Sequence, residues 1–198
     1  CKSFSGVSVL KNNHLELEAG EVHALLGENG AGKSTLIKIL GGVYTKDSGQ
    51  ILVDGQEVEI TGVESAKEHG IRIIHQELML IPDMTISENI FIGQEPKTKA
   101  GTVDKKKMNE MAQGFLDSMH LDLKSTQFIR DLNIAQQQMV EIIRAISFGA
   151  KIIVMDEPTS SLTENEVDAL FEAIKALKAK NVGIIYISHR MAELDAIT

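Results

Sequence analysis

The stretch that decides the fold is GENGAGKS, residues 27–34. It fits the spacing GxxxxGK[ST] and stands between an apolar run at 22–26 and a helical pattern that follows. Glycines in such a loop let backbone N–H groups wrap a phosphate, and the first turn of the helix adds its positive dipole. We therefore predict a phosphate-binding loop that consists of Gly27, Glu28, Asn29, Gly30, Ala31, Gly32, Lys33, Ser34 and Thr35.

Two side chains of this loop have predicted chemical roles. Lys33 is expected to reach the β- and γ-phosphates of a nucleotide, and the Ser34 hydroxyl is expected to ligate Mg²⁺. The alternative is a glycine-rich turn that merely joins a strand to a helix. Because that alternative gives the lysine no packing role, the sequence favours a nucleotide site.

A second motif, IIVMDEPTSS at 152–161, ends an apolar run in two acidic residues. Asp156 and Glu157 are thereby expected at the C-terminal edge of a sheet, where α/β folds bind ligands. We predict that Asp156 holds Mg²⁺ and that Glu157 polarises the attacking water as a general base. An acidic pair can also simply cap a strand, but a phosphate loop in the same chain favours the catalytic interpretation.

Two further polar residues follow apolar runs. Gln76 comes after IRIIH, and His189 comes after IIYIS. Each is expected at the same edge of the sheet, directed towards a γ-phosphate. Taken alone, either side chain is more simply read as a polar surface residue. Their order relative to the two motifs makes the functional interpretation stronger.

The spacing of apolar residues predicts an α/β fold with a mainly parallel sheet. Short, mostly β-branched runs at 22–26, 71–74, 152–155 and 184–187 are typical of buried parallel strands. A turn at Asp54-Gly55, inside the alternating pattern of 49–60, predicts a small antiparallel hairpin. Residues 164–180 predict a helix that packs on the sheet, and 77–150 predict an inserted helical subdomain within one domain spanning 1–198.

Composition excludes several classes of protein. The 198 residues are 43% hydrophobic, which is enough for a packed core, and the net charge of -8 argues against a nucleic-acid partner. No apolar stretch approaches the ~18 residues that span a bilayer. The single cysteine, Cys1, excludes an internal disulfide and favours a reducing compartment. Because the sequence begins without Met, we expect it to be a piece of a longer chain.

The order of these motifs resembles the ATP-binding subunit of ABC transporters, and the resemblance covers essentially the whole chain. It implies a P-loop NTPase core with ATP and Mg²⁺ as cofactors. It also implies that Phe4 stacks on adenine, that Gln76 senses Mg²⁺ and contacts the transmembrane permease subunits, and that His189 contacts the γ-phosphate.

Five stretches resemble carbohydrate importers of the ribose, xylose and galactoside type: GENGAGKSTLIKILGGVY, IIHQELMLIPDMTISENIFIGQE, QQQMVEI, MDEPTSSLTENEV and YISHRMAEL. The resemblance implies a peripheral subunit on the cytoplasmic face of the cell membrane. Its expected partners are a second ATPase domain, either fused or from a homodimer, permease subunits and, indirectly, an external sugar-binding protein. Two alternatives are a soluble ABC-type ATPase without a permease and a nucleotide-binding regulatory module without turnover.

The signature of that family, LSGGQ, is altered here to LNIAQ at Leu132, Asn133, Ile134, Ala135 and Gln136. In the family the Ser and Gly contact a γ-phosphate bound to the opposite domain. Asn caps a helix as well as Ser does, and Gln136 can complete a capping box with Asn133. The methyl group of Ala135 stands where Gly lets the backbone approach, so we expect a weaker nucleotide site facing this segment.

Overall fold

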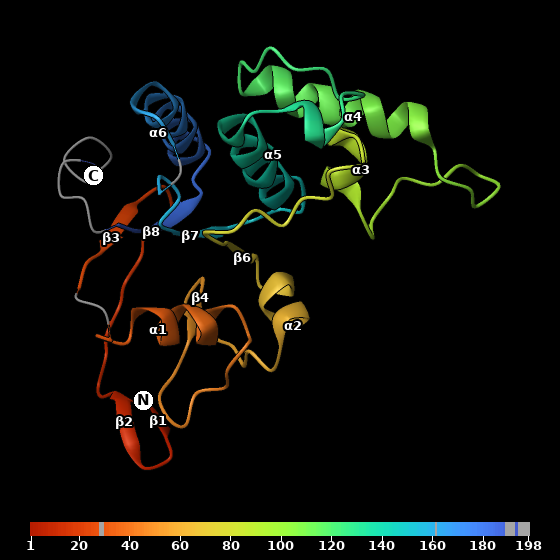
Figure 1. Cartoon of the computed structure of the whole chain (residues 1–198). Helices are drawn as coiled ribbons and strands as arrows, with labels where there is room; N and C mark the ends of the chain where they lie inside the picture. The colour runs from red at the N-terminus through yellow and green to blue at the C-terminus, as the bar shows by residue number, and fades with distance from the viewer. Residues whose placement is uncertain (28–29, 161, 189–192, 194–198) are drawn as a thin grey trace. The chain divides into compact units, whose positions relative to one another are not determined.

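The computed structural model of the chain describes residues 1–27, 30–160, 162–188 and 193 (Figure 1). The chain forms two compact units. The first unit contains Cys1–Ile73, Ala150–Glu157 and the described part of Leu177–Thr198. The second contains Ile74–Gly149 and Pro158–Ala176. Each unit is described by itself below.

A four-stranded sheet is the centre of the first unit (Figure 1). Its strand order is β3 (Val22–Leu25), β8 (Gly183–Ile187), β7 (Ile152–Asp156) and β6 (Ile71–Ile74). β8 pairs in parallel with both β3 and β7. The four apolar runs therefore form the predicted strands, and the parallel sheet is confirmed.

Helix α1 (Lys33–Leu40) packs on this sheet through an aliphatic core. Ile37 of the helix lies with Val154, Ile185 and Ile187 of the strands, and all four side chains are buried. Burial of each such side chain contributes about 1.5–3 kcal/mol, so this contact fixes where α1 begins relative to the strand ends.

Two small antiparallel hairpins complete the strands of this unit. β4 (Leu52–Val53) pairs with β5 (Gln56–Glu57) around Asp54 and Gly55, which have φ of 54° and 74° as a type I′ turn requires. This hairpin was predicted. β1 (Lys2–Phe4) and β2 (Val7–Leu10) form a second hairpin that the sequence did not reveal. Helix α2 (Val63–Glu68) precedes β6.

The second unit is helical. Between β6 and β7 it contains α3 (Ile86–Phe91), α4 (Lys105–Ser118), the 3-10 turn η1 (Ile129–Asp131) and α5 (Ile134–Ser147). Most of α6 (Glu164–Ala179) belongs to it as well. Helices thus occupy the predicted insertion, while the extent of a subdomain at 77–150 within one domain stays a prediction.

Capping boxes fix where two helices of this unit begin. The Thr85 hydroxyl accepts from the Glu88 amide, and the Glu88 carboxylate accepts from the Thr85 amide at 3.0 Å. This backbone hydrogen bond holds the pKa of Glu88 below its ordinary value. Behind the cap, Ile86 and Ile90 are fully buried, so capping and packing act on the same helix.

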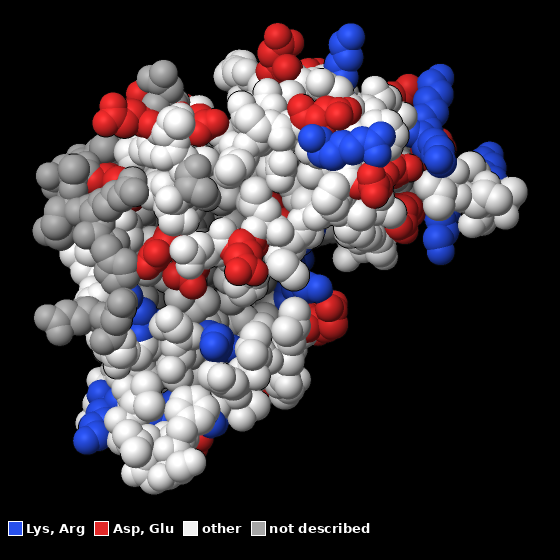
Figure 2. All heavy atoms as spheres, in the orientation of Figure 1, with Lys and Arg blue, Asp and Glu red and all other residues white. Residues whose placement is uncertain are grey.

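The surface gives two further observations. Within the described ranges, no helix has the length and hydropathy of a membrane span. On the face shown in Figure 2, Lys and Arg side chains lie dispersed among Asp and Glu side chains, and the described residues of that face form no continuous basic stripe.

The glycine that follows the C-terminal cap of α1 allows a close backbone contact and gives a test of this fold. A Cβ on Gly42 would lie 2.2 Å from the carbonyl carbon and oxygen of Gly62, whereas a Cβ on Gly55 would meet no atom within 4 Å. Both glycines have a φ near 75°. We expect Gly55→Ala to cost about 1–2 kcal/mol from backbone strain alone, and Gly42→Ala to cost about 1–3 kcal/mol more from the clash.

Urea unfolding of the two variants beside the parent measures this difference. The matched φ cancels the backbone strain, so the remaining gap reports the contact with Gly62. Equal losses of stability in the two variants would contradict the close approach.

Candidate functional site

The phosphate loop and the acidic pair line a single pocket of about 340 Å³ in the first unit. Its lining residues are Val9, Gly30, Ala31, Gly32, Lys33, Ser34, Thr35, Asp156, Glu157 and Ile187. The sequence predicted all of these except Val9 and Ile187. Two motifs more than a hundred residues apart therefore contribute to one site.

The loop has the backbone geometry of a phosphate cradle. Gly30 and Gly32 have φ of 87° and 93°, a region that disfavours other residues. A Cβ on Gly32 would lie 2.8 Å from Leu10 Cδ2 and 3.1 Å from the Val9 carbonyl oxygen. Glycine at this position therefore lets the β1–β2 hairpin pack directly against the loop.

The N-terminus of α1 suits an anion. The N-cap residue is Gly32, so no described side chain accepts from the first N–H groups of the helix. The first turn, all of which the structure describes, contains no acidic residue. The first N–H groups of the helix and its dipole therefore act on whatever enters the pocket. Lys33, the first helical residue, donates from Nζ to the Gly27 carbonyl oxygen, which keeps its ammonium group at the loop.

The acidic pair lies at the end of β7, as predicted. Asp156 is the last residue of the strand and is in register with Ile187 of β8. Glu157 has a φ of 49°, a strained conformation for a residue other than glycine, and its amide donates to the Ile187 carbonyl at 3.1 Å. Such strain costs about 1–3 kcal/mol and is concentrated at functional sites, so it supports the functional interpretation of Glu157.

Two of the side chains that carry oxygen atoms in this pocket were predicted to hold Mg²⁺. Ser34 and Asp156 both line the pocket, and hydroxyl and carboxylate oxygens are the ligands that this ion prefers. Among the residues that the structure describes, no group of three or more His, Cys, Asp or Glu could hold a metal ion. A magnesium ion here would thus need oxygens from phosphate and water, which is the usual arrangement at nucleotide sites.

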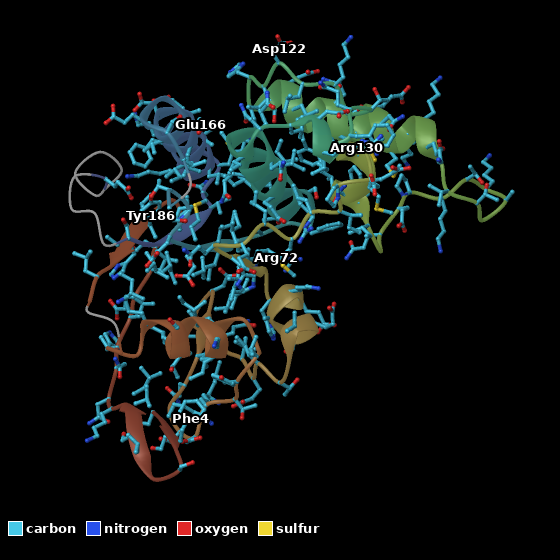
Figure 3. The ribbon with its side chains drawn as sticks, viewed as in Figure 1. Phe4, Arg72, Asp122, Arg130, Glu166 and Tyr186 are labelled. Atoms are coloured by element: carbon cyan, nitrogen blue, oxygen red, sulfur yellow. The ribbon has the colours of Figure 1, made fainter. Side chains whose placement is uncertain are left out.

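Phe4 lies at the end of β1 with 37% of its side chain exposed (Figure 3). Its ring meets Tyr44 edge-to-face, with centroids 5.2 Å apart, and the described lining of the phosphate pocket does not include it. Asp47 anchors this strand by accepting from Lys2 and from the Ser3 amide, both at 2.7 Å. The hydrogen bond from the Lys2 ammonium lowers the pKa of Asp47 most, and the bond from the Ser3 amide lowers it further. Stacking of Phe4 on adenine stays a prediction.

The altered signature forms a capped helix start in the second unit. The Asn133 side chain accepts from the Gln136 amide at 2.8 Å, and Gln136 Oε1 accepts from the Asn133 amide at 3.0 Å. The predicted capping box is therefore present. Leu132 is buried, and Ala135 is the second residue of α5, where its helical conformation tolerates a methyl group.

One further predicted site residue lies in the other unit, and three lie outside the described residues. Gln76 follows β6, is exposed and belongs to the second unit, so its contact with Mg²⁺ stays a prediction. Glu28, Asn29 and His189 lie outside the described residues.

Comparison with known proteins shows the family of this chain. Residues 10–160 match the model of a family described as ABC transporter. This chain belongs to the ABC transporter family. The match contains most residues that line the phosphate pocket, from Gly30 of the loop to Glu157 of the acidic pair.

Curated relatives of this ABC transporter chain have names that refer to sugar import. It is 50% identical over 197 residues to a ribose import ATP-binding protein of Clostridium perfringens, a match that covers 99% of this chain and 39% of that protein. It is 51% identical over 197 residues to a protein of Halalkalibacterium halodurans, provisionally named ribose/galactose/methyl galactoside import ATP-binding protein, covering 99% and 38%. The chain thus spans less than half the length of these relatives.

Solved structures of the family share the fold. A nucleotide-free ATP-binding cassette from an ABC transporter superposes with a TM-score of 0.82 at 26% identity, covering 99% of this chain and 81% of that one. An ATP-binding cassette in its ADP conformation gives a TM-score of 0.75 at 27% identity, covering 90% and 74%. The predicted P-loop NTPase core of the ABC type is confirmed.

The cap of α5 gives a test of the altered signature. Because its side chain accepts from the Gln136 amide, Asn133→Ala is expected to reduce the free energy of unfolding by about 1 kcal/mol. Asn133→Ser keeps a capping oxygen and is expected to stay within a few tenths of the parent. Denaturant unfolding measures both, and an Ala variant as stable as the Ser variant would show that the cap contributes nothing.

Proposed function

We propose that this chain binds and hydrolyses ATP, and that it energises import of a monosaccharide or galactoside through a membrane ABC transporter. The observation that carries the proposal is the single pocket shared by Lys33, Ser34, Asp156 and Glu157. A strand-ending acidic pair beside a phosphate loop provides both the binding and the hydrolytic groups that such an activity needs.

Each group in the pocket has a defined part in this reaction. The loop amides and Lys33 bind the phosphates, and Ser34 and Asp156 would hold Mg²⁺, which neutralises phosphate charge when bound. Glu157 accepts a proton from the attacking water, so that the water gains nucleophilicity as the bond to the γ-phosphate breaks. The Glu157 amide donates to the backbone of β8, and this bond fixes the backbone position from which the Glu157 side chain extends.

Two considerations support sugar import as the process. The relatives named above are named for ribose or galactoside import, and they match nearly the whole of this chain. The sequence resemblance includes IIHQELMLIPDMTISENIFIGQE, which lies outside the phosphate pocket. We therefore propose permease subunits, a second ATPase domain and an external sugar-binding protein as partners, with this chain at the cytoplasmic face of the membrane.

The role proposed for Glu157 predicts a separation of binding from turnover. Glu157→Gln keeps the size of the side chain but removes the proton acceptor, so we expect ATP binding to persist while turnover falls about 10²–10⁴-fold. Glu172→Gln, an exposed position on α6, is the matched control and is expected to match the parent. Hydrolysis by the full transporter with either variant is the measurement, and equal rates for Glu157→Gln and the parent would exclude Glu157 as the base.

We further propose that the two nucleotide sites of the assembly are unequal. The phosphate loop of this chain is intact, whereas its LNIAQ segment would face the partner domain's nucleotide with Asn and Ala in place of Ser and Gly. Lys33→Ala is therefore expected to remove most of the turnover. Substitution of the corresponding lysine in the partner domain is expected to remove less. Comparable losses from the two substitutions would show that the sites are equivalent.

A further inference from the structure

A buried carboxylate binds two hydroxyl groups at the C-terminal end of β8. Glu193 Oε2 accepts from Tyr186 Oη at 3.1 Å and from Ser188 Oγ at 2.7 Å. The exposed fractions of Glu193, Tyr186 and Ser188 are 6%, 0% and 3%. All three residues belong to the first unit, and Tyr186 is labelled in Figure 3. The end of the central strand is therefore held by a polar cluster inside the protein.

Glu193 is an unusual residue to bury. A carboxylate taken out of water is costly unless hydrogen bonds satisfy it, so packing alone would favour an apolar residue here. Buried tyrosine and serine hydroxyls likewise need acceptors. One oxygen of Glu193 serves both hydroxyls, and both donors come from the same end of one strand. The buried acid therefore restrains β8 at the point where the strand ends.

The residue between the two donors faces the other way. Tyr186 and Ser188 are two positions apart, and side chains at alternate positions of an extended chain lie on one face. Ile187 lies between them, packs in the buried cluster that contains Ile37 of α1, and lines the phosphate pocket. The backbone at Ile187 is thus held on one face by hydrogen bonds to Glu193 and on the other by apolar packing.

This same backbone position holds the proposed general base. The Ile187 carbonyl accepts from the Glu157 amide at 3.1 Å. Glu157 has a φ of 49°, and such a conformation persists only where the surrounding structure imposes it. A shift of the Ile187 carbonyl would therefore move or release the backbone of Glu157. The hydrogen bonds form a continuous path from Glu193, through the end of β8, to Glu157.

We propose that Glu193 is a positioning residue for Glu157. By binding the Tyr186 and Ser188 hydroxyls, it fixes the Ile187 carbonyl and, through it, the strained backbone from which the Glu157 side chain extends. Glu193 is not among the described residues that line the phosphate pocket, so it acts through β8. The hold on the Glu157 amide stands independently of activity, whereas its effect on turnover rests on the proposed function.

Hydrogen exchange of the full-length subunit tests the hold on Glu157. Glu193→Leu fills the buried space but removes the acceptor, so we expect the Glu157 amide to exchange at least ~10-fold faster while the Val154 amide stays protected. Glu193→Gln keeps an acceptor oxygen and is expected to lie near the parent. If Glu193→Leu does not fold, the double variant Tyr186→Phe with Ser188→Ala removes the same two hydrogen bonds.

Two results of this experiment would overturn the proposal. One is unchanged exchange of the Glu157 amide once the two hydrogen bonds are removed. The other is an equal loss of protection throughout β7 and β8, because Glu193 would then only satisfy buried hydroxyls and support the core.

Steady-state hydrolysis by the full transporter tests the consequence for turnover. We expect Glu193→Leu to lower kcat at least ~10-fold with KM for ATP within about twofold of the parent, and Glu193→Gln to restore most of the loss. Ile60→Ala removes a buried side chain from a separate apolar cluster. It is the control for reduced stability, and its kcat is expected to match the parent.

The outcomes separate this proposal from the proposed function. An unchanged kcat in Glu193→Leu, despite fast exchange at Glu157, would overturn the positioning role. An equal fall of kcat in Ile60→Ala would also overturn it, because lost stability would then explain both variants. A parent transporter that does not hydrolyse ATP would instead overturn the proposed function, and the exchange result would still decide the hold on Glu157.

Discussion

The parallel pairing of β8 with both β3 and β7 is the constraint on which the site depends. The carboxyl ends of parallel strands meet at one edge of a sheet, so this pairing brings the loop after β3 beside the acids that end β7. The amide of Glu157 bonds to the last residue of β8, which connects the acid directly to the strand between them. Burial of Ile184, Ile185 and Ile187 stabilises that central strand.

Backbone hydrogen bonds to side chains have a comparable role in the helical unit. Capping boxes at Thr85 and Asn133 fix where α3 and α5 begin. Glu141, Arg144 and Asn89 hold the backbone of Met79 and Ile81, in a segment for which the described part of the chain shows no strand pairing. A hydrogen bond of this kind contributes about 0.5–1.5 kcal/mol, so together these side chains favour one path of the segment. The altered signature still caps the start of α5, although Asn133 and Ala135 stand where the family has Ser and Gly.

Much of the fold and of the site could be predicted because the signals are local. The phosphate loop needs glycines, a lysine and a serine at fixed spacing, and buried strands need short β-branched runs. The Asp54-Gly55 turn and the Asn133 cap follow from the preferences of two or three adjacent residues. The β1–β2 hairpin was missed because β2 is largely exposed and therefore lacks an apolar run. Its Ser5-Gly6 turn is also a weak sequence signal for a hairpin. Tyr44 was missed because its contact with Phe4 joins residues forty apart.

The sequence by itself thus determined the phosphate loop, the acidic pair, the strands that carry them and the helix cap at LNIAQ. Each of these depends on neighbours within a few residues. Only the tertiary structure decided that Val9 and Ile187 complete the pocket, that Glu157 adopts a strained backbone, and that Glu141 holds Met79. These features arise where segments distant in the chain meet, because strand pairing and burial are cooperative properties of the folded chain that spacing alone does not encode.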